Sequence, residues 1–346
     1  QASDLRVVSY NVLTDNPWQG QGNRIGRQLA AVAADIYCFQ EIYNHTPAET
    51  ASYVSSWVSP SGGGHWFSAG QSDCIFVSRF PILQTWALSG NSAAWIDTSS
   101  EWGVPTMVIN AHLPCCANES GRQNECDQIA AFIRDQRLAG LLSTHPQAPV
   151  LILGDMNFVG ESRQRMTLLT GDILDETQWG WDSPPDADGT DLLDTKSRHV
   201  ARRQIYTWRN DNGSYSPGYL DYIIYSDAVL ELGRHFVLLT DEMSNSSLVQ
   251  NGLQFDDSSV SDHLLVAADF RPRVGGVSFR RGDCNSDGSL NISDAVASLL
   301  SLFGGGSPPN CQDACDANDD GTLDVSDPVT LLGMLFSGLG DLPAPG

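Results

Sequence analysis

The chain has 346 residues and a formal net charge of −23 at pH 7. This balance excludes binding of nucleic acid or of an anionic membrane through a broad basic surface. A polyanionic substrate would instead have to be held by local arginines and a bound divalent cation. No stretch approaches the ~18–20 apolar residues of a transmembrane helix, and none is typical of a secretory leader. Because the chain begins at Gln1, four residues before the first expected strand, we expect a processed, secreted protein.

In chain order, apolar or alternating runs predict strands, and most of these strands end in polar side chains. The runs are residues 5–12, 35–42, 108–113, 150–153, 219–225 and 264–268. Their polar ends are Asn11, Glu41, His112, Asp155, Asn157, Asp221, Asp262 and His263. One polar strand residue is usually a hydrogen-bonded core group, but a set drawn from acids, amides and imidazoles indicates a functional site. Residues 22–34, 47–58 and 121–142 have helical character between the strands.

The run at residues 150–153 is followed by Gly154, Asp155, Met156 and Asn157. Side chains two positions apart on an extended segment point to the same side, so we expect Asp155 and Asn157 to be presented together. A carboxylate beside a carboxamide suits holding a water or a metal against a phosphate. The same four residues also occur as an ordinary turn.

The motifs together resemble the endonuclease/exonuclease/phosphatase superfamily, in its deoxyribonuclease-like form. The resemblance covers residues 4–271 and rests on Ser9-Tyr10-Asn11-Val12, Gln40-Glu41, Ser78-Arg79-Phe80-Pro81, Ala111-His112-Leu113, Gly154-Asp155-Met156-Asn157, Leu220-Asp221-Tyr222 and Ser261-Asp262-His263. It implies a two-sheet α/β sandwich and metal-dependent hydrolysis of a phosphodiester. It does not choose the substrate, because one fold serves many.

For the metal side of such a site, the resemblance implies that Glu41 binds Mg²⁺ or Mn²⁺, hard cations that prefer oxygen ligands. Asn11 would orient Asp155 or contact the metal. Asp155 would orient or deprotonate the attacking water. Asn157 would donate its amide to a phosphate oxygen or fix the nucleophile.

For the phosphate side, His263 would act as a general base or as a cationic clamp. Asp221 would hydrogen-bond its other ring nitrogen and set the tautomer. Asp262 would reach the metal or cap the strand, and His112 would contact the scissile phosphate or protonate the leaving oxygen. Two features depart from the family. Leu13 stands where repair enzymes carry an acid, and no acidic partner for His112 can be placed from the sequence.

From Asp283 onward the chain has ten Asp and no Glu, Lys or Arg. Two segments there, 33 residues apart, place oxygen-bearing side chains at positions 1, 3, 5, 7, 9 and 12 of a loop with Gly at position 6, which is calcium-loop spacing. The expected calcium ligands are Asp283, Asn285, Asp287, Ser289, Asn291 and Asp294, then Asp316, Asn318, Asp320, Thr322, Asp324 and Asp327. The pair resembles a type I dockerin, a small α-helical EF-hand-like module. We therefore expect a catalytic domain at residues 1–271, a linker at 272–282 and a dockerin-like module with two Ca²⁺ at 283–346.

The eight cysteines fit a secreted protein with disulfides. We expect Cys126 to pair with Cys115 or Cys116 and to close a short loop after residue 113, while Cys38 and Cys74 stay as buried thiols.

The sequence thus predicts a secreted, metal-dependent phosphodiesterase, and first a nuclease that degrades extracellular DNA or RNA. The alternative enzyme is a phospholipid or sphingomyelin phosphodiesterase. A third hypothesis is an assembly protein, whose dockerin-like tail binds a cohesin-like partner or neighbouring copies in a homo-oligomer or filament.

Overall fold

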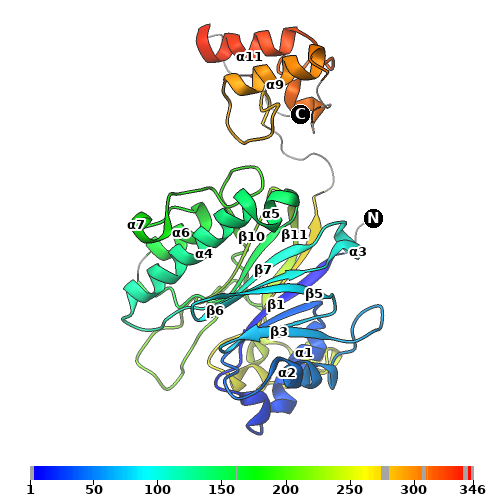
Figure 1. Ribbon diagram of the computed structural model, residues 1–346. Coiled ribbons are helices and arrows are strands. Elements are labelled where there is room, and N and C mark those ends of the chain that lie inside the picture. The colour runs from blue at the N-terminus through cyan, green and yellow to red at the C-terminus, as the bar shows by residue number, and fades with distance from the viewer. Residues whose placement is uncertain are drawn as a thin grey trace. The chain divides into compact units, whose positions relative to one another are not determined.

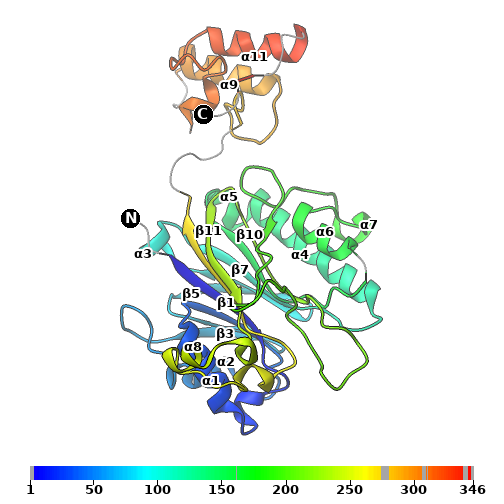
Figure 2. The same ribbon diagram turned by 180° about the vertical axis from the view of Figure 1, so that it is seen from behind.

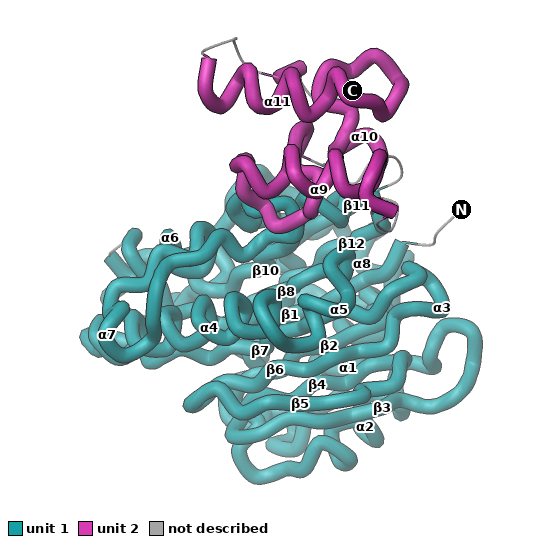
Figure 3. Tube along the Cα trace, turned by 45° about the horizontal axis from the view of Figure 1, so that its top comes forward, with its two compact units in different colours: residues 1–273 teal, residues 274–346 magenta. Residues whose placement is uncertain are grey.

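The computed structural model describes residues 4–160, 162–273, 280–305, 309, 311–337 and 342–343. The chain divides into two compact units, residues 1–273 and residues 274–346, which Figure 3 shows in different colours. In the described residues, no helix is both long and apolar enough to cross a membrane. Most of the expected linker, residues 274–279, lies outside the described residues.

The first unit contains two six-stranded mixed sheets. The first sheet has the order β11 (Leu230–Val237), β12 (Val266–Pro272), β1 (Leu5–Asn11), β2 (Ile36–Gln40), β4 (Cys74–Ser78), β3 (Phe67–Gln71). The second has the order β5 (Ile82–Leu88), β6 (Asn91–Ile96), β7 (Thr106–His112), β8 (Val150–Asp155), β10 (Asp221–Tyr225), β9 (Leu193–Asp194).

Helices cover the outer faces of the two sheets, as Figures 1 and 2 show from opposite sides. On the first sheet lie α1 (Gly22–Val32) and α2 (Pro47–Ser55), and on the second lie α4 (Glu119–Ala139) and α6 (Arg163–Thr170). The shorter helices of this unit are η1 (Asn16–Trp18), α3 (Ser99–Trp102), α5 (Leu141–Thr144), α7 (Glu176–Trp179), η2 (Thr240–Glu242), α8 (Asn245–Gln250) and η3 (Asp257–Val260).

The alternation of side chains along the strands explains the layers. On β8, Leu151 and Leu153 pack in the core between the two sheets, while Ile152 packs under the helices of the outer face. Val7 and Val8 on β1 divide in the same way between the inner core and the outer one. Both faces of these strands are buried, which is why their sequences read as continuous apolar runs. The predicted two-sheet α/β sandwich is confirmed.

The expected geometry at the end of β8 differs in one respect. The strand ends at Asp155, and Asn157 has a φ of +50°, so the extended conformation does not reach Asn157. The backbone N–H of Asn157 donates to Asp155 Oδ1 at 3.1 Å. This is a turn closed by the aspartate side chain, and the strand alternation expected for Asp155 and Asn157 does not apply.

The second unit is small and helical. It contains α9 (Ile292–Phe303), α10 (Gln312–Cys315) and α11 (Ser326–Ser337), packed around Ala295, Ala317 and Leu331. A disulfide between Cys284 and Cys315 joins its two halves. So small a core benefits from a covalent cross-link, because its own apolar burial is limited.

The predicted bridge to Cys126 is wrong. Cys115 and Cys116 are bonded to each other in an exposed loop, and Cys126 is a free thiol with no exposed surface. The reason is the position of Cys126 on the inner face of α4, where it packs in the outer core of the second sheet. Cys38 and Cys74 are buried free thiols, as predicted.

We predict that Gly154→Ala destabilises the first unit by about 3 kcal/mol, because it combines overpacking with backbone strain. Gly154 has a φ of +150°, and a Cβ there would lie 1.8 Å from the backbone oxygen of Ala111 on the neighbouring strand. Gly252→Ala is the matched control, since Gly252 has a φ of +66° with open space around it and should cost about 1 kcal/mol. Urea unfolding followed by tryptophan fluorescence measures both, because all nine tryptophans lie in residues 1–273. Equal losses in the two variants would contradict the close approach of β7 and β8.

Candidate active site

Polar residues of the inner strand faces meet at one end of the sandwich. Parallel pairing of β7 and β8 sets His112 beside Asp155, and antiparallel pairing of β8 and β10 sets Asp155 beside Asp221. In the other sheet, β1 and β2 set Asn11 beside Gln40. These five residues continue the inward-facing alternation of their strands at the point where the apolar side chains stop.

Asn11 connects the two sheets. Its amide nitrogen donates to Glu41 Oε1 at 3.0 Å and to Asp155 Oδ2 at 3.1 Å, while its oxygen accepts from the backbone N–H of Leu13. Asn11 and Asp155 are buried. Since its amide nitrogen faces both carboxylates, Asn11 orients them directly in this arrangement.

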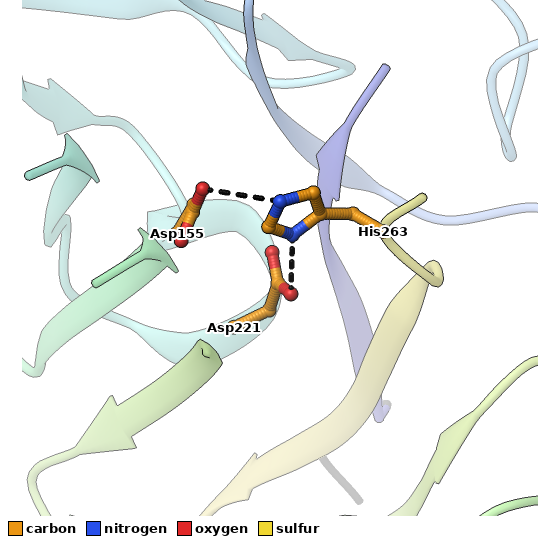
Figure 4. Close-up of side chains that lie close together, drawn as sticks. All are labelled: Asp155, Asp221 and His263. Carbon is orange, nitrogen blue, oxygen red and sulfur yellow. Dashed lines mark hydrogen bonds and ion pairs between the residues drawn. The ribbon is translucent and has the colours of Figure 1, made fainter. Parts of the chain in front are cut away.

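His263 lies between two aspartates, as Figure 4 shows. Its Nδ1 is 2.8 Å from Asp221 Oδ2, and its Nε2 is 3.4 Å from Asp155 Oδ2. Ser261 holds the segment that carries His263 against the end of β1. Its hydroxyl donates to the backbone oxygen of Asn11 and accepts from the backbone N–H of His263.

This environment changes the protonation of the buried groups. Burial opposes the charge on His263, but the carboxylates of Asp221 and Asp155 outweigh it and raise the pKa of His263 to about 10. Burial, with repulsion from Asp221, raises the pKa of Asp155 to about 6 although His263 and His112 oppose the rise. The contact between the two groups by itself raises the pKa of His263 and lowers that of Asp155, so it favours a proton on His263 over a proton on Asp155.

His112 has an acidic partner that the sequence did not reveal. Nδ1 of His112 is 2.6 Å from Asp73 Oδ2, and Asp73 also accepts from the backbone N–H of Glu41 at 3.1 Å. Burial lowers the pKa of His112, but Asp73 and Asp155 outweigh it and raise the pKa overall. Asp73 lies in the two-residue turn between β3 and β4, where an aspartate is the ordinary turn residue, so only its position in space distinguishes it.

Asn157 and Asp262 lie at the edges of this arrangement. The Asn157 amide donates to the backbone oxygen of Leu113, which fixes the segment after His112. Asp262 Oδ2 accepts from the indole N–H of Trp208 at 2.9 Å, whereas its Oδ1 is buried without a hydrogen-bond partner in the described structure. Asp221 Oδ1 is in the same situation.

Glu41, Asn11 and Asp262 carry side-chain oxygens of the kind that a hard divalent cation prefers. In the described residues, Asn11 meets Glu41 through its amide nitrogen, and Asp262 Oδ1 has no hydrogen-bond partner. Buried carboxylate oxygens without partners are costly unless a cation or a proton joins them. Asp155, Asp221 and His263 also place ligand atoms within 4.8 Å of one another, but the hydrogen bond between Asp221 and His263 already accounts for two of the three.

In the second unit, the carboxylates of the first loop converge. Asp283, Asp287 and Asp294 place carboxylate oxygens within 4.8 Å of one another. Asp283 accepts from the backbone N–H groups of Asp287 and Gly288, and Asp294 accepts from those of Asn285 and Asn291.

In the second loop, Asp316 accepts from the backbone N–H groups of Asp320 and Gly321, and Asp327 accepts from those of Asn318 and Asp324. The position-6 glycines have φ values of +82° and +79°. Of the remaining expected ligands, Ser289 and Thr322 donate their backbone N–H to the position-5 aspartates Asp287 and Asp320.

The sequence profile of the Endonuclease/Exonuclease/phosphatase family matches residues 8–263. No curated protein matches the chain. Among solved structures, an endonuclease/exonuclease/phosphatase from Bacteroides vulgatus is 14% identical with a TM-score of 0.50, over 78% of this chain and 100% of that one. A functionally unknown protein from Enterococcus faecalis V583 is 15% identical with a TM-score of 0.50, over 78% and 100%. ANGEL2, a 2',3'-cyclic phosphatase in complex with adenosine-2',3'-vanadate, is 18% identical with a TM-score of 0.50, over 78% and 96%. At these identities the structures show a shared fold.

We predict that the pair of His263 and Asp221 stabilises the first unit in a pH-dependent way. A histidine whose folded pKa of about 10 exceeds its unfolded value of 6.5 stabilises fully below pH 6.5, and the contribution is lost as pH rises through 10. Between pH 7 and pH 10 the native chain should therefore lose more free energy of unfolding than His263→Gln. Urea titrations in EDTA, read by tryptophan fluorescence, make this comparison. Parallel losses in both proteins would show that His263 is not protonated in the folded state.

Proposed function

Because the chain belongs to the endonuclease/exonuclease/phosphatase family, whose members hydrolyse phosphoesters, we propose that it is a secreted, metal-dependent nuclease. The observation that carries the proposal is the position of Asp155. It is buried between the Asn11 amide and the His263 ring, and His112 is beside it in the adjacent strand. A phosphodiesterase needs a base, charge stabilisation and a proton for the leaving group in this proximity.

Each group has a role in the proposed reaction. Asp155 accepts the proton of the attacking water, and its pKa of about 6 leaves it ionised at neutral to alkaline pH. His263, protonated and fixed by Asp221, contacts a non-bridging phosphate oxygen as a cationic clamp. His112, oriented by Asp73, gives its Nε2 proton to the leaving oxygen.

The metal and amide ligands complete the site. Glu41, with Asn11 and Asp262, would hold Mg²⁺ or Mn²⁺, which supplies positive charge to the phosphate oxygens when bound. Asn157, whose amide already donates one N–H to the backbone oxygen of Leu113, would donate its other N–H to a phosphate oxygen or fix the nucleophile.

A loop beside the site favours nucleic acid over lipid. Trp208 pairs with both Gly218 and His263, so the base of the segment between Trp208 and Gly218 adjoins the catalytic histidine. The segment contains one strongly exposed aromatic residue, Tyr215, among Asn, Ser and Gly. A segment that enters a bilayer would need several apolar side chains, whereas a single aromatic ring suits stacking on a base. The phospholipid or sphingomyelin phosphodiesterase is therefore the alternative that the test includes.

Secretion and a docking role rest on the cysteines and on the second unit. The disulfide between Cys284 and Cys315 is typical of an oxidising compartment. The second unit is proposed to be a dockerin-like module that binds two Ca²⁺ through its two acidic loops. Its two longer helices, with the residue that precedes α11, expose apolar side chains in pairs 33 positions apart, which are Ile292 and Val325, Val296 and Val329, and Phe303 and Phe336.

Exposed apolar side chains in such repeated positions favour docking to another protein. A cohesin-like partner or a neighbouring copy of the chain would cover them.

We predict metal-dependent cleavage of plasmid DNA and no turnover of sphingomyelin vesicles, tested side by side with Mg²⁺, Mn²⁺ or EDTA. His263→Ala should lower kcat by about 10²–10⁴-fold, as expected for loss of a group that acts in the transition state. His65→Ala, at an exposed histidine whose ring is tilted by 49° against that of Phe67, is the matched control and should keep full activity. Turnover of lipid without cleavage of DNA would contradict the nuclease and support the phospholipid or sphingomyelin phosphodiesterase. Folded protein without activity on either substrate would make assembly the leading function.

We also predict that Ca²⁺ raises the unfolding temperature of the second unit. Without a cation its ten aspartates repel one another, and cation binding to the folded loops is linked to folding. Calorimetry of the full chain with Ca²⁺ and with chelator measures the shift, and the double variant Asp294→Asn with Asp327→Asn should abolish it. The molar mass of the full chain, measured with Ca²⁺ and with chelator, tests self-assembly. An unchanged mass would contradict binding between copies of the chain and favour a different protein as the partner.

A further inference from the structure

The backbone is strained at three consecutive residues that follow Val12. Leu13, Thr14 and Asp15 have consecutive φ values of +54°, +48° and +58°. None is a glycine, and Thr14 is β-branched, so this left-handed conformation is unfavourable at every position. Such strain persists only where surrounding contacts determine the conformation, and it concentrates at functional sites.

Asp15 supplies these contacts. Its side chain is almost fully buried and accepts from the backbone N–H groups of Tyr43 and Asn44, from the Asn44 amide at 2.7 Å, and from the ring of His45 at 3.3 Å. Its own backbone N–H donates to the backbone oxygen of Glu41 at 3.0 Å. Asp15 therefore ties the strained turn to the segment that follows β2.

The second link is a stacked pair of rings. Trp18 lies 3.8 Å from His45 between ring centroids, with the ring planes 7° apart. Together with the bonds of Asp15, this contact holds residues 13–18 against residues 41–45 at two places.

These contacts place Thr14 against the carboxylate of Glu41. Its backbone N–H donates to Glu41 Oε2 at 2.9 Å, and its hydroxyl donates to the same oxygen at 3.1 Å. Asn11 holds the other carboxylate oxygen. Glu41 itself has a φ of +63°, so both the carboxylate and the backbone beneath it are constrained.

We propose that Thr14 is a positioning residue for the metal ligand Glu41, and that the strained turn exists to direct its two donors at that carboxylate. The inference rests on the proposed metal site at Glu41 and adds to it the group that orients this ligand. A glutamate has three side-chain torsions, and fixing them before the cation arrives removes an entropic cost from binding. Groups that hydrogen-bond a metal ligand in this way typically change metal affinity by 10–100-fold.

The test is Mn²⁺ binding to the full chain, followed by the electron paramagnetic resonance signal of free Mn²⁺. Glu41→Gln defines the catalytic site, because the carboxylates of residues 283–346 stay intact in that variant. Thr14→Val keeps the shape and the backbone donor but removes the hydroxyl, and it should weaken binding at this site by about 10-fold. Thr14→Ser restores the hydroxyl and should bind Mn²⁺ within about 2-fold of the native chain. Thr14→Gly controls for destabilisation, because glycine adopts a positive φ without strain. This variant should also bind Mn²⁺ more weakly than the native chain.

The outcomes separate the two proposals. Loss of Mn²⁺ binding in Glu41→Gln with native affinity in both Thr14→Val and Thr14→Gly would overturn the role of Thr14 and keep the metal site. Unchanged binding in Glu41→Gln would overturn the metal site itself. Urea midpoints of the same variants by tryptophan fluorescence complete the test. If Thr14→Gly binds Mn²⁺ more weakly while its urea midpoint is native or higher, the result supports a positioning role. If Mn²⁺ affinity falls only in variants whose urea midpoint also falls, the result contradicts that role.

Discussion

The contact on which the site depends is the hydrogen bond from Asn11 to Asp155 across the two sheets. An ionised carboxylate between two apolar layers is stable only with partners, since burial without them costs several kcal/mol. Asn11 comes from one sheet and Asp155 from the other, and the same amide nitrogen also contacts Glu41. The bond therefore fixes the distance between the sheets at the site and the direction of both carboxylates. Farther inside the sandwich, Gln40 makes a second bond of this kind to Asn110 at 2.7 Å.

Strained backbone surrounds this contact, although Ala33, Ser89, Cys116 and Lys196 have a positive φ elsewhere in the first unit. The turn after β1, the residue after β2 and the turn after β8 all contain non-glycine residues with positive φ, at Thr14, Glu41 and Asn157 among others. The apolar layers behind them are regular and fully buried on both faces. A rigid sandwich can stabilise an unfavourable backbone at its edge, which is the division expected for a site that must be formed before substrate binds.

Much of this could be predicted from the sequence because it depends on local order. The apolar runs of β1, β7 and β8 and their polar ends follow from the alternation of side chains, and parallel strands bring such ends to one edge. Asp73 could not be predicted, because an acid in a two-residue turn has no local feature that marks it as the partner of His112. The bridge expected at Cys126 was wrong for a similar reason. Spacing along the chain does not tell which face of α4 a cysteine occupies.

By itself, then, the sequence determined the fold class, the strand ends that carry the polar set and the two registered acidic loops, because all of these are patterns of near neighbours. Only the tertiary structure decided which donors meet which carboxylates. Thr14 on Glu41, Asp73 on His112 and Trp208 on Asp262 join segments between 27 and 54 positions apart. The packing of the two sheets and the strained turns at their edge determine these hydrogen-bond partners, and no local sequence pattern indicates them.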